Sequence, residues 1–221
     1  MVYILNIETA TKNCSVGLSK HGQLIALKEF AGEGYAHAEK LHVFIEDVLK
    51  EGNISFLDLS AVAVSMGPGS YTGLRIGVSA AKGLCYALNI PLIAIDTLQL
   101  LALKICVTDG VIMPMIDARR MEAYTAVFDS EYNKIRETKA EIVTEGFFDD
   151  ITGPIHLVGD GAAKFSEVLP AGKFIYHDDT IYPSAAQMAQ PAFDKYKKSD
   201  TVDVAYFEPY YLKDFIAGKP N

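Results

Sequence analysis

The chain has 221 residues, of which 50% are hydrophobic, and a formal net charge of -8 at neutral pH. This length and apolar content suit one large domain or two small ones with a sizeable core. The acidic balance argues against independent binding to nucleic acid, which depends on lysine and arginine side chains displacing phosphate counterions.

The sequence also bears on location. No apolar run approaches the roughly 20 residues of a membrane span, because charged residues interrupt the longest hydrophobic region. The N-terminus runs straight into a predicted strand, without the basic start and long apolar centre of a signal peptide. Cys14, Cys85 and Cys106 are odd in number and far apart, so they indicate neither a disulfide framework nor a zinc site. We expect a cytoplasmic protein that does not associate with membranes.

The first half of the chain alternates between strands and helices. Apolar and β-branched runs predict strands at residues 2–7, 15–19, 23–30, 60–66 and 91–95. Helical periodicity predicts helices at residues 35–50, 71–88 and 98–105. This order implies an α/β fold in which a mixed sheet is flanked by helices.

The segment MGPGSYTGLRIGVSAAKG joins a predicted buried strand to a predicted helix. Gly67, Pro68 and Gly69 end the strand, and either Ser70 or Thr72 can cap the helix. The turn could present N–H groups to a phosphate, or the glycines of the turn and helix could serve close packing alone. The segment lacks both the P-loop lysine and GxGxxG spacing, which favours packing.

The second half of the chain repeats the plan of the first. After residue 111 an apolar strand ends in an acid, Asp117, as the first strand ends in Glu8, and a hairpin follows in each case. We interpret this as an internal duplication with lobes at residues 1–105 and 106–221. In the second lobe we expect helices at residues 145–150 and 184–197 and a strand at residues 155–158, from which a glycine turn at residues 159–161 leads into residues 162–168.

Acidic residues at the ends of matching strands, with glycine turns between them, indicate a nucleotide cleft of the sugar kinase, Hsp70 and actin (ASKHA) type. The candidate residues of this nucleotide site are Glu8, Gly67, Gly69, Ser70, Asp117, Arg119, Gly159 and Gly161. The alternative is that Glu8 and Asp117 only cap local turns. Arg119 and Arg120 could clamp an anion, or could pair with carboxylates such as Glu122.

The histidines do not predict a metal site. His37 and His42 are five residues apart on a predicted helix, so their rings diverge, and we interpret them as solvated or interface histidines. The sequence indicates no partner for His156 or His177, and no catalytic triad can be identified.

Four segments together support a family resemblance: ILNIETAT, SMGPGSYTGLRIGVSAAKGLCYALNIPLIAIDTL, MIDARRMEAYTAVF and EPYYL. In this order they resemble the bacterial TsaB family, also called YeaZ, over nearly the whole chain. The resemblance implies a two-lobed ASKHA fold, kinship with the threonylcarbamoyl-transferase subunit TsaD, and a role in making threonylcarbamoyladenosine next to the anticodon of tRNAs.

The resemblance also bears on catalysis. In TsaD, the second and third histidines of an HHxxxH-like segment hold a metal, and here Thr97 and Leu101 stand at those positions. Leucine has no donor atom and threonine is a poor ligand for a transition metal. Glu8 replaces the aspartate more usual in the family, which further weakens the case for a nucleotide. The resemblance therefore implies no catalytic residue and no cofactor, the alternative being a metal-dependent peptidase or an ATPase of the same fold.

The family resemblance implies a scaffold that pairs with TsaD, lets the ATPase TsaE join, forms a homodimer alone and meets tRNA only through the complex. The expected contact surface comprises the helices at residues 35–50 and 71–88, with His37, Glu39, Leu41, Tyr71, Leu74, Arg75, Gly77, Val78 and Ala81. A bulky residue at Gly77 should then abolish pairing and leave the monomer folded. If Gly77 packs inside the lobe, the same change should cause misfolding.

Overall fold

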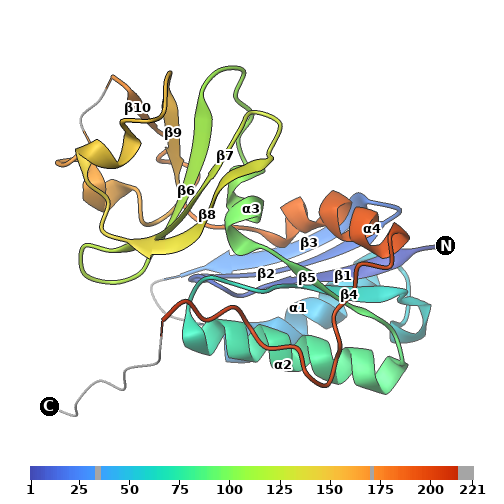
Figure 1. Ribbon diagram of the computed structural model, residues 1–221. Helices are drawn as coiled ribbons and strands as arrows, with labels where there is room; N and C mark the ends of the chain where they lie inside the picture. The colour runs from blue at the N-terminus through green and yellow to red at the C-terminus, as the bar shows by residue number, and fades with distance from the viewer. Residues whose placement is uncertain (33–35, 170–171, 214–221) are drawn as a thin grey trace, which may run out of the picture.

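The structure is a computed structural model that describes residues 1–32, 36–169 and 172–213. These residues form two five-stranded sheets that lie in two lobes (Figure 1). The first sheet has the order β3-β2-β1-β4-β5 and the second the order β10-β9-β6-β7-β8. Each lobe therefore begins with an antiparallel three-stranded meander and adds two strands parallel to its first strand. This shared topology agrees with the predicted duplication.

The first sheet matches the predicted strands closely. It contains β1 (Tyr3–Glu8), β2 (Asn13–Lys20), β3 (Gln23–Ala31), β4 (Ala61–Ser65) and β5 (Leu92–Ile95). The second sheet contains β6 (Val111–Asp117), β7 (Ala123–Phe128), β8 (Lys134–Glu141), β9 (Ile155–Val158) and β10 (Phe174–Tyr176). Strands β1 and β4 are buried along almost their full length, as expected for strands covered on both faces.

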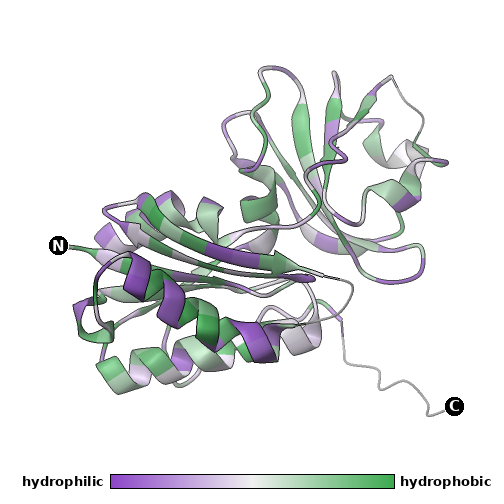
Figure 2. Cartoon of the chain, turned by 180° about the vertical axis from the view of Figure 1, so that it is seen from behind, coloured by the Kyte–Doolittle hydropathy of each residue, from purple (hydrophilic) through white to green (hydrophobic). Residues whose placement is uncertain are grey.

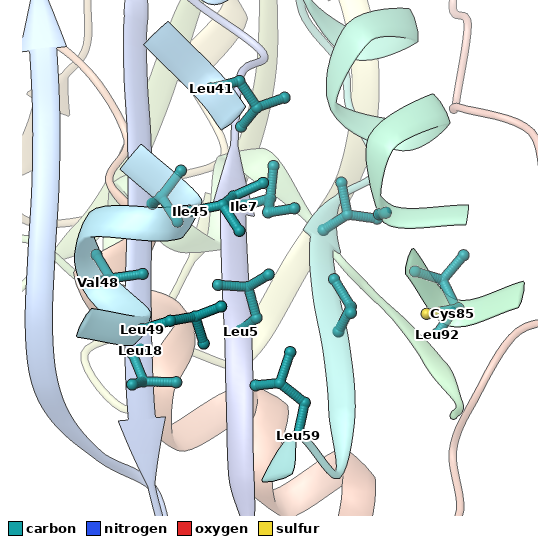
Figure 3. Close-up of a cluster of buried hydrophobic side chains, with 14 of the residues drawn as sticks. Leu5, Ile7, Leu18, Leu41, Ile45, Val48, Leu49, Leu59, Cys85 and Leu92 are labelled. Carbon is teal, nitrogen blue, oxygen red and sulfur yellow. The ribbon is translucent and has the colours of Figure 1, made fainter. Parts of the chain in front are cut away.

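One face of the first sheet is covered by α1 (His37–Glu51) and α2 (Tyr71–Leu88). Apolar residues of α1 recur at i, i+4, i+7 and i+8, which places one stripe of the helix on the sheet. Figure 3 shows this stripe against β1 and β2, with the buried side chains Leu41, Ile45, Val48, Leu49, Leu5, Ile7 and Leu18. Truncating one such leucine to alanine costs about 2–5 kcal/mol, so this contact is a major source of stability.

The other face of the first sheet is covered by α4 (Ala189–Lys197), by the preceding turn η4 (Ala185–Met188) and by α3 (Thr97–Ala102) (Figure 1). The sequence-based division assigned everything after residue 105 to the second lobe. In space, η4 and α4 instead pack on Ile4, Ile93 and Ile95 of the first sheet. The chain returns to the first lobe because that sheet has a second apolar face to bury.

The helices expected in the second lobe are much shorter than predicted. Residues 145–150 contain only the 3-10 turn η2 (Glu145–Phe148). A second 3-10 turn, η3 (Ala163–Phe165), follows the glycine turn after β9. Residues 184–197 are divided between η4 and α4, and β10 was not predicted. Phe148 and Phe165, which are fully buried, cover the sheet from these turns, so two aromatic side chains replace whole helices there.

Helix α2 carries small residues on two sides. Gly73 and Gly77 face inward. A Cβ on Gly73 would lie 2.1 Å from the Thr9 carbonyl oxygen, and a Cβ on Gly77 would lie 2.2 Å from the Thr9 hydroxyl oxygen. Gly83 faces outward, and its Cβ would meet nothing within 4 Å. The prediction that the face containing Gly77 is free for another subunit is therefore wrong. That face is closed by the end of β1 in the same lobe.

We predict that Gly77→Val lowers the free energy of unfolding by about 1–3 kcal/mol, because the added methyl groups overlap Thr9. Gly83→Val, on the same helix, should change it by less than about 0.5 kcal/mol, because valine and glycine differ little in helix propensity and the site is open. Urea unfolding of both variants measures the difference. Equal stability of the two variants would contradict the inward packing of Gly77.

Candidate functional site

A cleft with a volume of about 1300 Å³ lies between the two lobes. One wall is formed by the β1–β2 turn and by the glycine turn that leads into α2, and the other by the β6–β7 turn and the turn after β9. The C-terminal segment, residues 210–213, lines the same cleft. Of the eight residues predicted for a nucleotide site, the structure brings these to the cleft: Gly69, Ser70, Asp117, Arg119 and Gly159.

The glycine turn packs tightly against the segment after β1. A Cβ on Gly69 would lie 2.3 Å from the Ala10 carbonyl oxygen, so only glycine fits. The Ser70 N–H donates to that same oxygen at 2.6 Å, and the Ser70 hydroxyl accepts from the Gly73 N–H at 3.3 Å. Ser70 is therefore the helix cap, and two N–H groups that could have met a phosphate are used within the chain. This geometry favours the packing interpretation.

Glu8 is fully buried and does not line the cleft. Its Oε1 accepts the Ala10 N–H at 2.5 Å. Burial raises the pKa of the Glu8 carboxyl to about 7, against the smaller lowering that the Ala10 N–H provides. Glu8 thus caps the turn after β1, which was the alternative to a place in a nucleotide site. Asp117, its counterpart in the second lobe, is exposed instead.

Lys164 organises the β6–β7 turn around Asp117. The Lys164 ammonium forms an ion pair with Asp117 Oδ1 at 2.5 Å and donates to the carbonyl oxygens of Arg120, at 3.0 Å, and of Glu122. The Arg119 N–H also donates to Asp117 Oδ1, at 2.9 Å. With its carboxylate engaged by a lysine and an amide, Asp117 caps this turn as Glu8 caps the other.

The second glycine turn is also closed by packing. A Cβ on Gly159 would lie 2.3 Å from the Met115 carbonyl oxygen, and the Gly161 N–H donates to that oxygen at 2.9 Å. Between them, Asp160 Oδ1 accepts the Asp117 N–H at 3.0 Å. Burial raises the pKa of Asp160, opposed mainly by that hydrogen bond. The turn after β9 therefore fixes the end of β6.

Arg119 and Arg120 both reach the cleft from residues with left-handed backbone, at φ 67° and 53°. Neither guanidinium takes part in an ion pair among the described residues. The alternative considered for them, an ion pair with Glu122, is not formed, and Glu122 pairs with Lys213. The two arginines remain candidates for an external anion.

Six residues predicted for partner binding point into the first lobe and are buried: His37, Leu41, Leu74, Gly77, Val78 and Ala81. Three others reach the surface: Glu39 and Arg75 are exposed and Tyr71 is half-buried. Arg75 lies 4.2 Å from the Tyr71 ring centre. His37 is neither solvated nor at an interface, since its Nε2 meets the Thr11 carbonyl oxygen at 2.8 Å and burial lowers its pKa. His42 is exposed, as expected.

Sequence reasoning missed several residues of the cleft. Lys12, which lines the cleft, and Lys164, which holds the β6–β7 turn beside it, gave no signal, because single lysines in turns are common. His177 lines the cleft, and its ring nitrogen lies 3.0 Å from that of His156, a residue distant in sequence. The contact of residues 210–213 with the glycine turn had one usable signal, the EPYYL segment, which carried the family resemblance without indicating where it lies.

Comparison with known proteins defines the family. A family model described as TsaD, tRNA N6-adenosine threonylcarbamoyltransferase, matches residues 34–194. The chain is 32% identical to the tRNA threonylcarbamoyladenosine biosynthesis protein TsaB of Escherichia coli (strain K12), covering 98% of this chain and 96% of that protein. The chain belongs to the TsaB family. It is 27% identical to TsaB of Haemophilus influenzae (strain ATCC 51907 / DSM 11121 / KW20 / Rd), covering 98% and 95% of the two chains.

Solved structures agree on the fold of this TsaB family member. YeaZ from Pseudomonas aeruginosa superposes with a TM-score of 0.82 at 23% identity, covering 96% of this chain and all (100%) of that one. The activator of 2-hydroxyisocaproyl-CoA dehydratase from Clostridium difficile, solved with bound ADPNP, superposes with a TM-score of 0.53 at 10% identity, covering 90% and 97% of the two chains. The chain has the two-lobed ASKHA fold that the sequence predicted.

The described residues contain neither a membrane-spanning helix nor a cluster of metal ligands. No helix there is long and apolar enough to cross a bilayer. No three or more histidine, cysteine, aspartate or glutamate side chains there lie together in a way that could hold a metal ion. Thr97 and Leu101 stand at the positions compared above with the metal-binding histidines of TsaD. The Thr97 hydroxyl accepts the Gly67 N–H at 3.0 Å. Leu101 lies on α3 and is buried against the second sheet.

The raised pKa of Glu8 predicts a pH-dependent stability. Between its ordinary value of 4.5 and about 7, the folded protein holds a proton that the unfolded chain has lost. Stability should therefore fall as the pH rises through this window and level off above it. Glutamine does not titrate, so Glu8→Gln should lack this loss of stability. The unfolding free energy of the wild type should fall relative to that of Glu8→Gln by about 2–3 kcal/mol between pH 5 and pH 8, since one pKa unit corresponds to 1.36 kcal/mol. Urea unfolding at a series of pH values measures this difference. If the unfolding free energies of the two proteins change with pH in the same way, the pKa of Glu8 is not raised.

Proposed function

We propose that this chain is a non-catalytic subunit of the complex that forms N6-threonylcarbamoyladenosine next to the anticodon of tRNAs. In this role it binds and activates a TsaD-type transferase and allows a TsaE-type ATPase to join. The family membership supports a role in this biosynthesis, and the geometry of α1 and α2 supports a scaffold. The proposal places the protein in the cytoplasm and gives it contact with tRNA only through the complex.

The observation that carries the proposal is the outward face of α2. Ser79, Gly83 and Ala87 are exposed and recur every four residues, so they form one stripe along the helix. Such small side chains let a second helix approach closely, and helix pairs of this kind pack with ridges in grooves. Helix α1 lies beside α2 on the same side of the first sheet (Figure 2), and its Val43 is 52% exposed.

This face differs from the one that the sequence suggested. The inner stripe with Gly77 is closed within the lobe, and the outer stripe with Gly83 is open. Of the residues first assigned to partner binding, the proposal keeps Glu39, Tyr71 and Arg75, which reach the surface. In isolation a second copy of the chain could pair through the same two helices, which gives a homodimer.

The absence of catalysis is proposed from residues that serve other purposes. Thr97 caps the glycine turn and Leu101 belongs to the core, so neither is available to bind a ligand. Glu8 is sealed from the cleft, and Asp117 is held by Lys164. Glu8 and Asp117 therefore stabilise turns, which supports a cleft without catalytic carboxylates at these two positions. We accordingly propose no cofactor for this chain.

We predict that Ser79→Trp weakens pairing with a purified TsaD-type transferase at least about tenfold, because a large ring on the small stripe prevents close helix approach. Lys198→Trp, on an exposed position beyond α4, is the matched control and should bind normally. Calorimetric titration measures both affinities, and urea unfolding confirms that both variants are folded. Normal binding by Ser79→Trp would place the contact elsewhere.

Reconstitution tests the role itself. Purified TsaD-type and TsaE-type proteins, the threonylcarbamoyl donor and tRNA should yield the modified nucleoside only when this chain is added. Ser79→Trp should lower the yield in proportion to its lost affinity. Full modification without the chain would overturn the scaffold role, and hydrolysis of ATP by the isolated chain would show that it is an enzyme.

A further inference from the structure

The C-terminal segment after α4 follows a defined path over the first lobe. Val202 pairs with Leu92 at the edge of β5, and Val204 and Phe207 pack on the core under α2. The Lys82 ammonium donates to the carbonyl oxygens of Ala205, at 3.1 Å, and Phe207, at 3.0 Å. We refer to residues 202–213 as the C-terminal strap, which runs alongside α2 in Figure 1.

The end of the strap covers the glycine turn. The Tyr210 N–H donates to the Met66 carbonyl oxygen at 2.7 Å, and a Cβ on Gly67 would lie 2.9 Å from the Tyr210 carbonyl oxygen. The rings of Tyr211 and Tyr71 lie 4.9 Å apart. The strap is thus held to the first lobe by hydrogen bonds and ring contacts over its whole length.

Beyond these anchors the strap reaches the second lobe. Lys213 forms an ion pair with Glu122 and donates to the Ala118 carbonyl oxygen at 3.3 Å. Both acceptors belong to the β6–β7 turn, and all three residues line or border the cleft. Lys213 therefore connects the two walls of the cleft.

We propose that the C-terminal strap is a clasp that sets the opening of the cleft, with the Lys213–Glu122 ion pair as its releasable contact. A partly exposed ion pair between two free side chains contributes little stability. Here the strap is already fixed beside the cleft, so Lys213 is presented to Glu122 at a high effective concentration. The pair thereby opposes movement of one lobe relative to the other.

Besides the strap, two segments of the chain join the lobes. Helix α3 packs on the second sheet through Leu98 and Leu101, and the chain passes between the lobes around residues 103–110 and 181–184. The clasp adds a contact on the cleft wall, away from α3, and a rotation of one lobe about α3 would separate this contact.

Distance measurements between the lobes test the clasp. Spin labels on cysteines introduced at Leu57 and Ile142, which are 86% and 62% exposed, report the opening by pulsed electron resonance. The background carries Cys106→Ser, since Cys14 and Cys85 are buried. The wild type should give a narrow distribution that broadens in concentrated salt, because salt screens the ion pair.

Lys213→Ala and Lys213→Glu should shift the distribution to longer distances and broaden it, the second more than the first. Lys213→Glu combined with Glu122→Lys should restore the narrow distribution. Lys195→Ala removes an ion pair with Asp200 within the first lobe and should change nothing. Circular dichroism confirms folding. A wild-type distribution in both Lys213 variants, a failure of the charge swap, or an equal effect of Lys195→Ala would each overturn the proposal.

Discussion

The structure depends on the close approach of α2 and its glycine turn to the segment that follows β1. The carbonyl oxygens of Thr9 and Ala10 lie where side chains of residues 73 and 69 would otherwise stand. Because both atoms belong to the backbone, they cannot move aside as a flexible side chain could. The turn is held further by the Thr9 hydroxyl, which donates to the Gly73 carbonyl oxygen at 2.8 Å. This contact fixes the angle at which α2 leaves the sheet, and so the direction of its outer face.

The two lobes show how one duplicated plan can serve two purposes. Glu8 and Asp117 occupy equivalent positions at the ends of β1 and β6, and each accepts an N–H from its own turn. Glu8 is sealed under the glycine turn and carries a raised pKa, whereas Asp117 stays at the surface in an ion pair with Lys164. The same position in the two lobes therefore carries a buried carboxyl in one and a surface ion pair beside the cleft in the other.

The sequence was informative where a pattern is local. Apolar and β-branched runs and the helical periodicity of residues 35–50 predicted the first sheet and its helix, because each depends on neighbouring residues. The direction of α2 could not be predicted in this way, since small residues occur on both of its sides and only Thr9, far away in sequence, shows which side is closed. The return of α4 to the first sheet and the path of the strap are tertiary contacts of the same kind. For the candidate site, the sequence placed Asp117 and Arg119 at the cleft, but it could not reveal that Glu8 is buried.

The strap links α2 to the β6–β7 turn at the cleft. Lys82 lies on α2 and holds the strap, and the strap in turn holds the glycine turn and the second lobe. A change in the position of α2 relative to the sheet would therefore be transmitted to the clasp through a short series of direct contacts. Thermodynamic linkage requires the reverse as well: if opening the cleft alters the strap, it must alter the affinity of the α2 face by the same free energy. Under the proposed scaffold role, this linkage predicts that binding of a partner to the outer face of α2 changes the opening of the cleft.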